Sequence, residues 1–126
     1  MILIVDDDPE FLGAATAQLT RDGNHVLAAK DASRAFSLIE TVGFELGIAL
    51  IDLNLGKLSG FDLIQAIEAK DASLPVIAFS GVSSQPVLES AMVFGAREVL
   101  RKPIDHKWRA AIERVRRRSD REPLKG

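Results

Sequence analysis

The chain has 126 residues, of which 47% are hydrophobic and 27% are charged, and its formal net charge is −2. This length fits one domain with a single core, and no apolar run is long enough to span a bilayer. The absence of cysteine excludes disulfides and thiolate metal sites, and it fits a cytoplasmic protein. The composition therefore predicts one globular domain without a membrane segment.

The charged residues are divided unevenly along the chain. Residues 101–126 hold 10 of the 16 Lys and Arg residues, whereas residues 1–100 hold 14 of the 18 Asp and Glu residues. Five of the late basic residues are Arg114, Arg116, Arg117, Arg118 and Arg121. Positive charge is favourable at the end of a helix, so we expect a solvated basic face there. We expect no direct contact with nucleic acid in this segment.

Five short apolar runs lack polar alternation, which is the pattern of strands that are buried on both faces. These predicted strands cover residues 2–5, 25–29, 46–51, 76–80 and 99–100. Segments with helical spacing of apolar residues alternate with them, and a capping residue or a proline precedes each segment. The expected helix starts are marked by Asp8-Pro9, Asp31, Ser59, Pro86 and Asp105.

Strict alternation of strands and helices predicts an α/β fold. We expect a doubly wound (βα)5 protein with a parallel five-stranded sheet in the order 2-1-3-4-5, which is a flavodoxin-like arrangement. The domain is expected to cover residues 1–118, and residues 119–126 to form a basic C-terminal tail or the remnant of a linker. In this strand order the ligand crevice lies at the carboxyl ends of the first and third strands.

Three acidic residues fall at that crevice. Asp6 and Asp7 follow the first strand, and Asp52 ends the third. Asp52 alone could simply bond loop amides, but three converging carboxylates repel one another unless a cation lies between them. Oxygen ligands without His or Cys favour Mg²⁺, and the backbone carbonyl of Asn54 is a further candidate ligand.

Two other polar residues end the fourth and fifth strands. Ser80 offers a hydroxyl group and Lys102 a point charge at the same edge of the sheet. Together they could hold phosphoryl oxygens while an ionised Asp52 attacks phosphorus to form an aspartyl phosphate.

These residues resemble the motifs of the CheY-like receiver domain of two-component response regulators, over nearly the whole chain. The resemblance implies that Asp7 and Asp6 bind the metal, with Asp7 the direct ligand, and that Asp52 accepts the phosphoryl group. It implies that Ser80 is the switch hydroxyl, that Lys102 contacts the phosphoryl group, and that the Lys102–Pro103 peptide bond is cis.

The resemblance also implies a function, that of a phosphorylation-dependent signalling switch. Such a domain takes its phosphoryl group from a histidine kinase or a phosphotransfer protein and changes the surface of its fourth helix, fifth strand and fifth helix. A downstream protein partner, or a second phosphorylated copy, would read that surface. The chain would then be no enzyme for separate substrates, although such domains catalyse their own phosphorylation and dephosphorylation.

The sequence departs from the family pattern at several positions. Val99 replaces the usual Tyr or Phe, the ring that moves inward when the switch hydroxyl moves. Gly56 stands where the family often has proline. Val82 is apolar at a position that tunes dephosphorylation and kinase pairing in the family, and the position of Asn54 has the same influence. These departures leave two alternatives open, a degenerate receiver that acts as a constitutive docking domain and a small Mg²⁺-dependent phosphatase with an Asp nucleophile.

Overall fold

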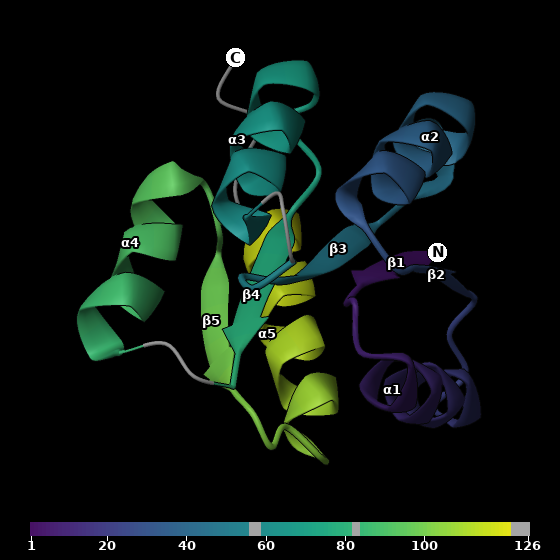
Figure 1. Ribbon diagram of the computed structural model, residues 1–126. Helices are drawn as coiled ribbons and strands as arrows, with labels where there is room; N and C mark the ends of the chain where they lie inside the picture. The colour runs from purple at the N-terminus through teal and green to yellow at the C-terminus, as the bar shows by residue number, and fades with distance from the viewer. Residues whose placement is uncertain (56–58, 82–83, 122–126) are drawn as a thin grey trace.

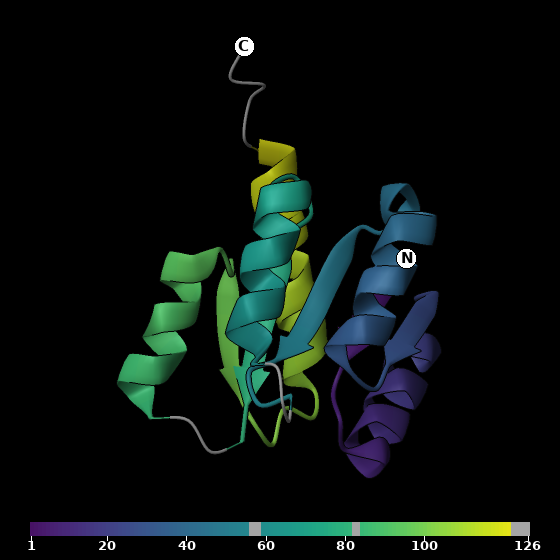
Figure 2. The same ribbon diagram turned by 45° about the horizontal axis from the view of Figure 1, so that its top comes forward.

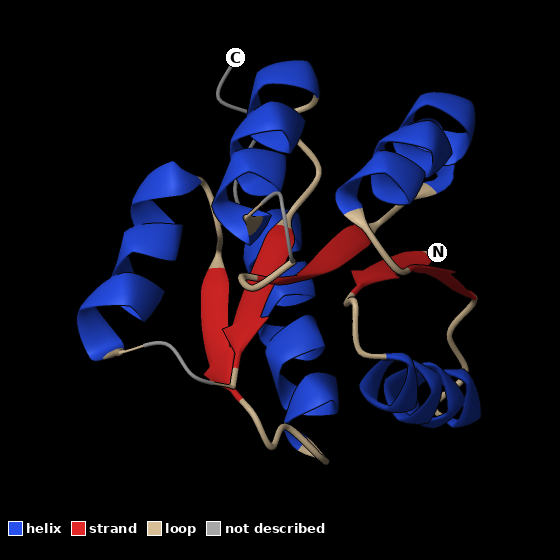
Figure 3. Cartoon of the chain, viewed as in Figure 1, coloured by secondary structure: helices blue, strands red, loops and turns tan. Residues whose placement is uncertain are grey.

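Five parallel strands form one sheet, and helices cover both of its faces (Figure 1; Figure 3). The structure, a computed structural model, describes residues 1–55, 59–81 and 84–121, with side chains described as far as Arg118. Its elements are β1 (Ile2–Val5), α1 (Pro9–Arg21), β2 (Val26–Ala29), α2 (Ala32–Val42), the 3₁₀ turn η1 (Gly43–Glu45), β3 (Ile48–Asp52), α3 (Gly60–Lys70), β4 (Val76–Ser80), α4 (Gln85–Phe94), β5 (Glu98–Arg101) and α5 (Lys107–Arg121). The strand order is β2-β1-β3-β4-β5, so the predicted fold class and order are confirmed.

The central strands are apolar because both of their faces are covered. Every residue of β1, β3 and β4 is buried. The register places Asp52 beside Phe79. It also places Ser80 beside Arg101. The carboxyl ends of these neighbouring strands are therefore level, and the residues that follow them meet at one edge of the sheet.

Two apolar layers lie on opposite faces of the sheet. Alternate residues of a strand point to opposite faces, so Leu3 packs in the layer under α2, α3 and α4, whereas Ile4 packs in the layer under α1 and α5. Figure 2 shows this division, with α3 in teal on one side of the strands and α5 in yellow on the other. The second layer holds two large aromatic residues, Phe79 of β4 and Trp108 of α5.

Local signals place the helices as predicted at most ends. The predicted N-caps of α1, α2 and α3 are Asp8, Asp31 and Ser59, and each side chain accepts a hydrogen bond from a backbone N–H of the first turn. Gly95 follows α4 with φ +128°, a conformation that residues with a Cβ rarely adopt. The helices are thus positioned by their own sequences as well as by the sheet.

Some predicted boundaries were wrong. β2 begins at Val26 rather than at residue 25, and β3 begins at Ile48 rather than at residue 46. The reason in the second case is η1: Gly43 has right-handed helical geometry and continues α2 into a 3₁₀ turn, which the Leu46 N–H closes on the Gly43 carbonyl at 3.0 Å. β5 is longer than predicted and covers Glu98–Arg101.

The start of the last helix also differs from the prediction. Asp105 does not cap it, because Asp105 has φ 46°, outside the extended conformation of N-cap residues, and α5 begins two residues later at Lys107. The Asp105 carbonyl instead accepts a hydrogen bond of 2.6 Å from Gln18 Nε2 of α1. This bond joins the loop before α5 to α1.

At its other end α5 extends to Arg121, so the predicted domain boundary at residue 118 falls within this helix. Residues 122–126 of the predicted tail lie outside the described residues. Among the helices that the structure describes, none combines the length and the apolar character that a membrane crossing requires.

Candidate functional site

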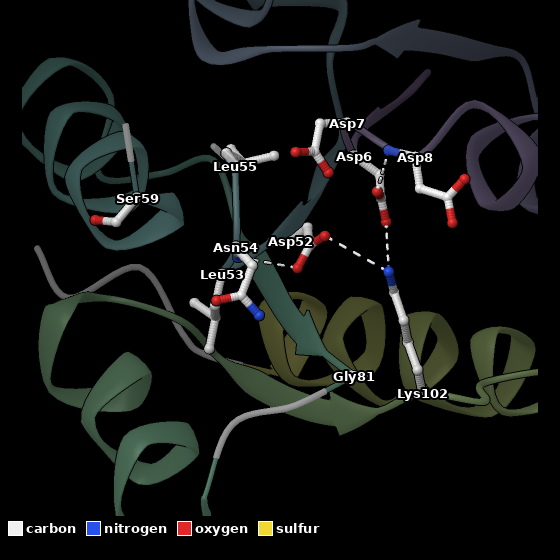
Figure 4. Close-up of a pocket in the computed structure, with 10 residues that line it drawn as sticks. All are labelled: Asp6, Asp7, Asp8, Asp52, Leu53, Asn54, Leu55, Ser59, Gly81 and Lys102. Atoms are coloured by element: carbon white, nitrogen blue, oxygen red, sulfur yellow. Dashed lines mark hydrogen bonds and ion pairs between the residues drawn. The ribbon is translucent and has the colours of Figure 1, made fainter. Parts of the chain in front are cut away.

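A hollow of about 520 Å³ lies at the carboxyl edge of the sheet (Figure 4). Its walls come from the segments that follow β1, β3, β4 and β5. The charged residues that line it are Asp6, Asp7, Asp8, Asp52 and Lys102. The fold thus brings side chains nearly one hundred residues apart in the sequence into one site.

The acidic residues of the hollow form a compact cluster. Asp6, Asp7 and Asp52 each offer one carboxylate oxygen, and these oxygens lie within 4.8 Å of one another. Asp6 and Asp52 are almost entirely buried, with 0% and 3% of their surface exposed, whereas Asp7 is exposed. Buried carboxylates are costly unless a cation compensates their charge. The cluster is therefore suited to binding positive charge.

Burial raises the pKa of Asp52 to about 6, and the neighbouring charge of Asp6 also raises it. The backbone N–H of Asn54 donates a hydrogen bond of 3.0 Å to Asp52 Oδ1, and this bond and the charge of Lys102 act in the opposite direction. The Asp52 carboxylate therefore holds a proton more readily than an ordinary aspartate does. Because this pKa still lies below 7, the carboxylate is mostly ionised at neutral pH.

Lys102 places a positive charge inside this hollow. Its Nζ lies 2.9 Å from Asp6 Oδ2 and 3.5 Å from Asp52 Oδ2. Burial by itself lowers the pKa of Lys102, but the contacts with the two carboxylates outweigh burial, and the pKa is raised. Lys102 is therefore a fixed cation at the site.

The Lys102 ammonium also lies over an aromatic ring. Nζ is 4.1 Å from the centroid of the Phe11 ring on α1 and 5.6 Å from that of Phe79. In the sequence, Phe11 is one of the apolar residues with helical spacing after Asp8-Pro9, and nothing else distinguishes it. The helical spacing could not distinguish core packing from a contact with Lys102, because both need an apolar residue on the same face.

Ser80 is buried at the end of β4, and its Oγ accepts a hydrogen bond of 3.0 Å from Asn54 Nδ2. The bond links the end of β4 to the loop after β3. The sequence predicted a backbone role for Asn54 and missed this side-chain contact.

The start of α3 supports the loop that carries Asp52. The Gly60 N–H donates a hydrogen bond of 3.0 Å to the Leu53 carbonyl. A Cβ at Gly60 would overlap the Asp52 carbonyl oxygen and would lie 2.7 Å from the Leu53 Cα. Glycine is thus required here because α3 begins in direct contact with the backbone of the acidic site.

The residues of the hollow fit a hard divalent cation. The cluster offers only carboxylate oxygens, and no His lines the hollow in the part of the chain that the structure describes. Asp6 Oδ2 is buried and has no hydrogen-bond partner among the described residues, so its only compensation is the ion pair with Lys102. This donor set supports the predicted Mg²⁺. Asn54 lines the same hollow, and its carbonyl stays a predicted ligand.

The other predicted residues also have defined places. The Lys102–Pro103 peptide bond is cis. Val99 is half-buried and packs against the apolar layer under α2, α3 and α4. Gly56 and Val82, two of the departures from the family pattern, lie outside the described residues. The structure thus brings the predicted site residues to one edge of the sheet, whereas their chemical roles stay predictions.

The fold and the site together define a class of protein. It has an open parallel α/β sheet in the order 2-1-3-4-5, with an acidic cluster, a buried hydroxyl and a lysine at the carboxyl edge. The profile of the response regulator receiver domain matches residues 2–113, and the chain belongs to this family.

The chain is also similar in sequence to individual regulatory proteins. The heme response regulator HssR of Staphylococcus saprophyticus is 31% identical over 105 residues, which cover 83% of this chain and 46% of that protein. The C4-dicarboxylate transport transcriptional regulatory protein DctD of Pseudomonas aeruginosa is 30% identical over 116 residues, which cover 92% of this chain and 24% of that protein. The chain therefore spans about a quarter to a half of the length of these curated relatives.

Solved structures match the chain nearly from end to end. The crystal structure of a response regulator receiver domain protein from Clostridium thermocellum superposes with a TM-score of 0.89 at 28% identity. The match covers 94% of this chain and 95% of that chain. The chain is thus a receiver domain of the two-component response regulators.

Proposed function

We propose that this receiver domain is a phosphorylation-dependent signalling switch with Asp52 as its phosphoacceptor. The observation that carries the proposal is the convergence of the buried Asp52 with Asp6, Asp7 and Lys102 in one open hollow. The family membership supports the same role. The donor of the phosphoryl group would be a phosphohistidine of a sensor histidine kinase or of a phosphotransfer protein.

In the proposed reaction, a carboxylate oxygen of Asp52 attacks the phosphorus atom of the phosphohistidine. The O–P bond forms as the P–N bond breaks, and the imidazole leaves with the electron pair of that bond and takes up a proton from water. Lys102 Nζ, 3.5 Å from Asp52 Oδ2, would neutralise charge on the transferring group. Asp7, Asp6, Asp52 and the Asn54 carbonyl would hold Mg²⁺, which supplies further charge compensation at the phosphoryl oxygens.

Ser80 would transmit the change at Asp52 to the rest of the domain. A phosphoryl group adds negative charge and strong acceptor oxygens, to which the Ser80 hydroxyl can donate. A hydroxyl can donate and accept at the same time, so Ser80 Oγ could keep the 3.0 Å hydrogen bond that it accepts from Asn54 Nδ2. β4 ends at Ser80 and α4 begins at Gln85, so a displacement of Ser80 would reach α4 directly.

The proposed output surface consists of α4, β5 and α5. Glu98 of β5 is held by Arg114 at 2.8 and 2.9 Å and by Arg118 at 2.9 Å. Arg101 of β5 donates a hydrogen bond of 3.3 Å to Gln85 at the start of α4. These contacts couple the three elements, so a shift of α4 would alter a surface that a downstream partner or a second phosphorylated copy can bind. We place the switch in the cytoplasm.

Two alternatives compete with this proposal. A degenerate receiver that acts as a constitutive docking domain would not need phosphorylation, and Val99 in place of the family's aromatic ring favours it. A small Mg²⁺-dependent phosphatase would use Asp52 on many phosphate esters, but in that class of enzyme a cap covers the substrate, and no such cap stands over the hollow among the described residues. We propose that the chain is no enzyme for separate substrates.

One experiment separates the three functions. The purified chain is incubated with Mg²⁺ and acetyl phosphate, and its intact mass is recorded with time. We expect one phosphoryl adduct, lost in Asp52→Asn and kept in Glu40→Gln, which changes an exposed carboxylate on α2. Rapid turnover of phosphate esters would instead indicate a phosphatase, and an unmodified chain would indicate the docking domain.

A further inference from the structure

The contact between Phe11 and Lys102 has a geometry that the proposed reaction does not require. The ammonium lies 4.1 Å from the centroid of the Phe11 ring, within the range of a favourable cation–π interaction. The same ammonium forms ion pairs with Asp6 and Asp52. Lys102 is therefore held in two ways, by two carboxylates and by a ring face.

The Phe11 ring is itself held in place. It stacks on Phe79 with a centroid separation of 5.3 Å and an interplanar angle of 29°. Phe79 in turn packs edge-on against Trp108, 5.2 Å away. Because Phe79 and Trp108 are fully buried, the ring under the ammonium rests on a rigid base.

The two kinds of support differ in how they respond to a divalent cation. Asp6 and Asp52 belong to the acidic cluster, so a cation bound there would share the carboxylates that now pair with Lys102. It would also repel the ammonium by its own charge. The attraction of the Phe11 ring does not depend on those carboxylates and would persist.

A second hollow beside Phe11 could accommodate the Lys102 ammonium outside the acidic site. This hollow has a volume of about 380 Å³, lies between α1 and the segment before α5, and is bordered by both Phe11 and Lys102. A smaller side chain at position 11 would widen it beside the lysine. Without the ring, Lys102 could turn from the acidic site into this space.

We propose that Phe11 is a positioning residue that keeps the Lys102 ammonium at Asp52 when a divalent cation occupies the acidic cluster. The inference deepens the proposed function and rests on it, because a positioned Lys102 matters for phosphoryl transfer to Asp52. It assigns Phe11 a role that requires an aromatic face and not merely an apolar side chain.

The first test uses the unmodified chain and does not depend on phosphorylation. Lysine labelled with ¹³C and ¹⁵N reports the Lys102 Hε protons by NMR, and Lys102→Arg assigns their signal. A proton above a ring face is shifted upfield, so we expect an upfield Hε signal without metal that stays upfield at saturating Mg²⁺. Loss of the upfield shift on addition of Mg²⁺ would overturn the proposal.

The second test compares substitutions at position 11. Phe11→Leu keeps an apolar side chain but removes the ring, so the Hε signal should move downfield and phosphorylation by acetyl phosphate should slow by about fivefold. Phe11→Tyr should preserve both properties. Phe44→Leu is the matched control, because Phe44 is 87% exposed in η1 and does not line the site.

The outcomes distinguish this inference from the proposed function. A folded Phe11→Leu variant with the unmodified rate and an unmoved Hε signal would overturn the role of the ring. If the unmodified chain gains no phosphoryl mass, the proposed function fails, whereas the Mg²⁺ titration of the Hε signal still decides the positioning role. If Phe11→Leu does not fold, the unmodified chain and Phe11→Tyr carry the test.

Discussion

Asp52 lies where an ionised carboxylate destabilises the fold that carries it. Burial and the nearby Asp6 raise its pKa to about 6, and the Asn54 N–H and Lys102 offset only part of this effect. The folded chain therefore binds a proton at Asp52 in a pH range in which the unfolded chain has already released it. An ionised Asp52, which the proposed function requires, therefore lowers the stability of the folded chain.

The pH dependence of unfolding tests this conclusion. The pKa of Asp52 in the folded chain lies above its ordinary value of 3.8. The contribution of Asp52 to the free energy of unfolding is therefore greatest below about pH 4, and it is lost as the pH rises through about 6. Asp52→Asn has no carboxylate to ionise, so it should not lose this stability. One pKa unit corresponds to about 1.4 kcal/mol, so the variant should be more stable than the unmodified chain at pH 7.5 by as much as about 3 kcal/mol. Urea unfolding with EDTA at pH 4 and 7.5 measures both.

Glu40→Gln is the control for that measurement, since it removes an exposed carboxylate from α2. It should leave the difference between the two pH values almost unchanged. A gain at pH 7.5 in Glu40→Gln as large as that in Asp52→Asn would show that net charge, and not the site, determines the effect.

The bond between Asn54 and Ser80 can be measured by a double-mutant cycle. Asn54→Ala and Ser80→Ala each remove one partner of the 3.0 Å hydrogen bond, and the double variant removes both. A neutral hydrogen bond contributes about 1 kcal/mol, so we expect a coupling free energy of that size from urea unfolding. A coupling near zero would mean that the bond does not restrain Ser80.

Sequence reasoning reached the residues of the site because their positions follow from the fold. Asp52 and Ser80 end strands, so knowing the strand order was enough to place them at one edge. The Asn54 side chain and the Phe11 ring were missed because their contacts depend on rotamers. No spacing in the sequence specifies which way these side chains turn.

At the scale of elements, Gly60 makes the start of α3 part of the site. A Cβ there would overlap the backbone of Asp52, and backbone cannot move aside as a flexible side chain can. We expect Gly60→Ala to lower the free energy of unfolding by about 1–3 kcal/mol or more. Denaturant unfolding measures the loss.

Gly13→Ala is the matched control for Gly60→Ala. Gly13 lies inside α1, and a Cβ there meets nothing within 4 Å. Alanine favours the helix, so this substitution should stabilise the domain by about 0.5–1 kcal/mol. Equal losses in the two variants would contradict the steric account of Gly60.

The proposed switch predicts a change that can be measured in individual elements. Beryllofluoride, a stand-in for the phosphoryl group, should draw Ser80 toward Asp52 and change amide exchange mainly in residues 81–90. Val99 is too short to fill space that the hydroxyl vacates, so we expect little change on β5. Asp52→Asn should abolish the response, and a response confined to α1 would contradict this route.

Element boundaries were less predictable than the elements themselves. Apolar runs identified the five described strands, but β3 is shorter than predicted, because Gly43 keeps right-handed helical geometry and leads α2 into the 3₁₀ turn Gly43–Glu45. Asp105 is of a residue type that commonly caps helices, but its backbone has a left-handed conformation. Such choices depend on what a loop must connect, and the local sequence does not specify them.

At the scale of the whole molecule, Mg²⁺ should stabilise the folded chain. The cation relieves repulsion among Asp6, Asp7 and Asp52, and the unfolded chain has no such cluster. At a hundredfold excess over Kd the gain is about 2.7 kcal/mol. Thermal unfolding with increasing Mg²⁺ should show this gain, reversed by EDTA and strongly reduced in Asp7→Asn. An equal gain in Asp7→Asn would place the cation elsewhere.

The fold as a whole was the most predictable level. Alternation of five apolar runs with five amphipathic segments restricts the chain to a doubly wound sheet, because parallel strands need crossover helices on both faces. Leu3 and Ile4 then enter opposite layers simply by strand alternation. The alternation of residues along the strands thus predicts the packing on each face of the sheet. It does not predict surface contacts such as the ion pair between Glu98 and Arg114.

The aromatic base beneath Lys102 has a practical consequence. Trp108 is the only tryptophan, and the chain contains no tyrosine, so near-ultraviolet emission comes from this one indole. The indole packs against Phe79, which precedes Ser80 in β4 and stacks on Phe11, the ring beneath the Lys102 ammonium. We therefore expect the fluorescence of the unlabelled chain to respond to events at the acidic edge, so that stopped-flow mixing could follow cation binding and phosphorylation in real time.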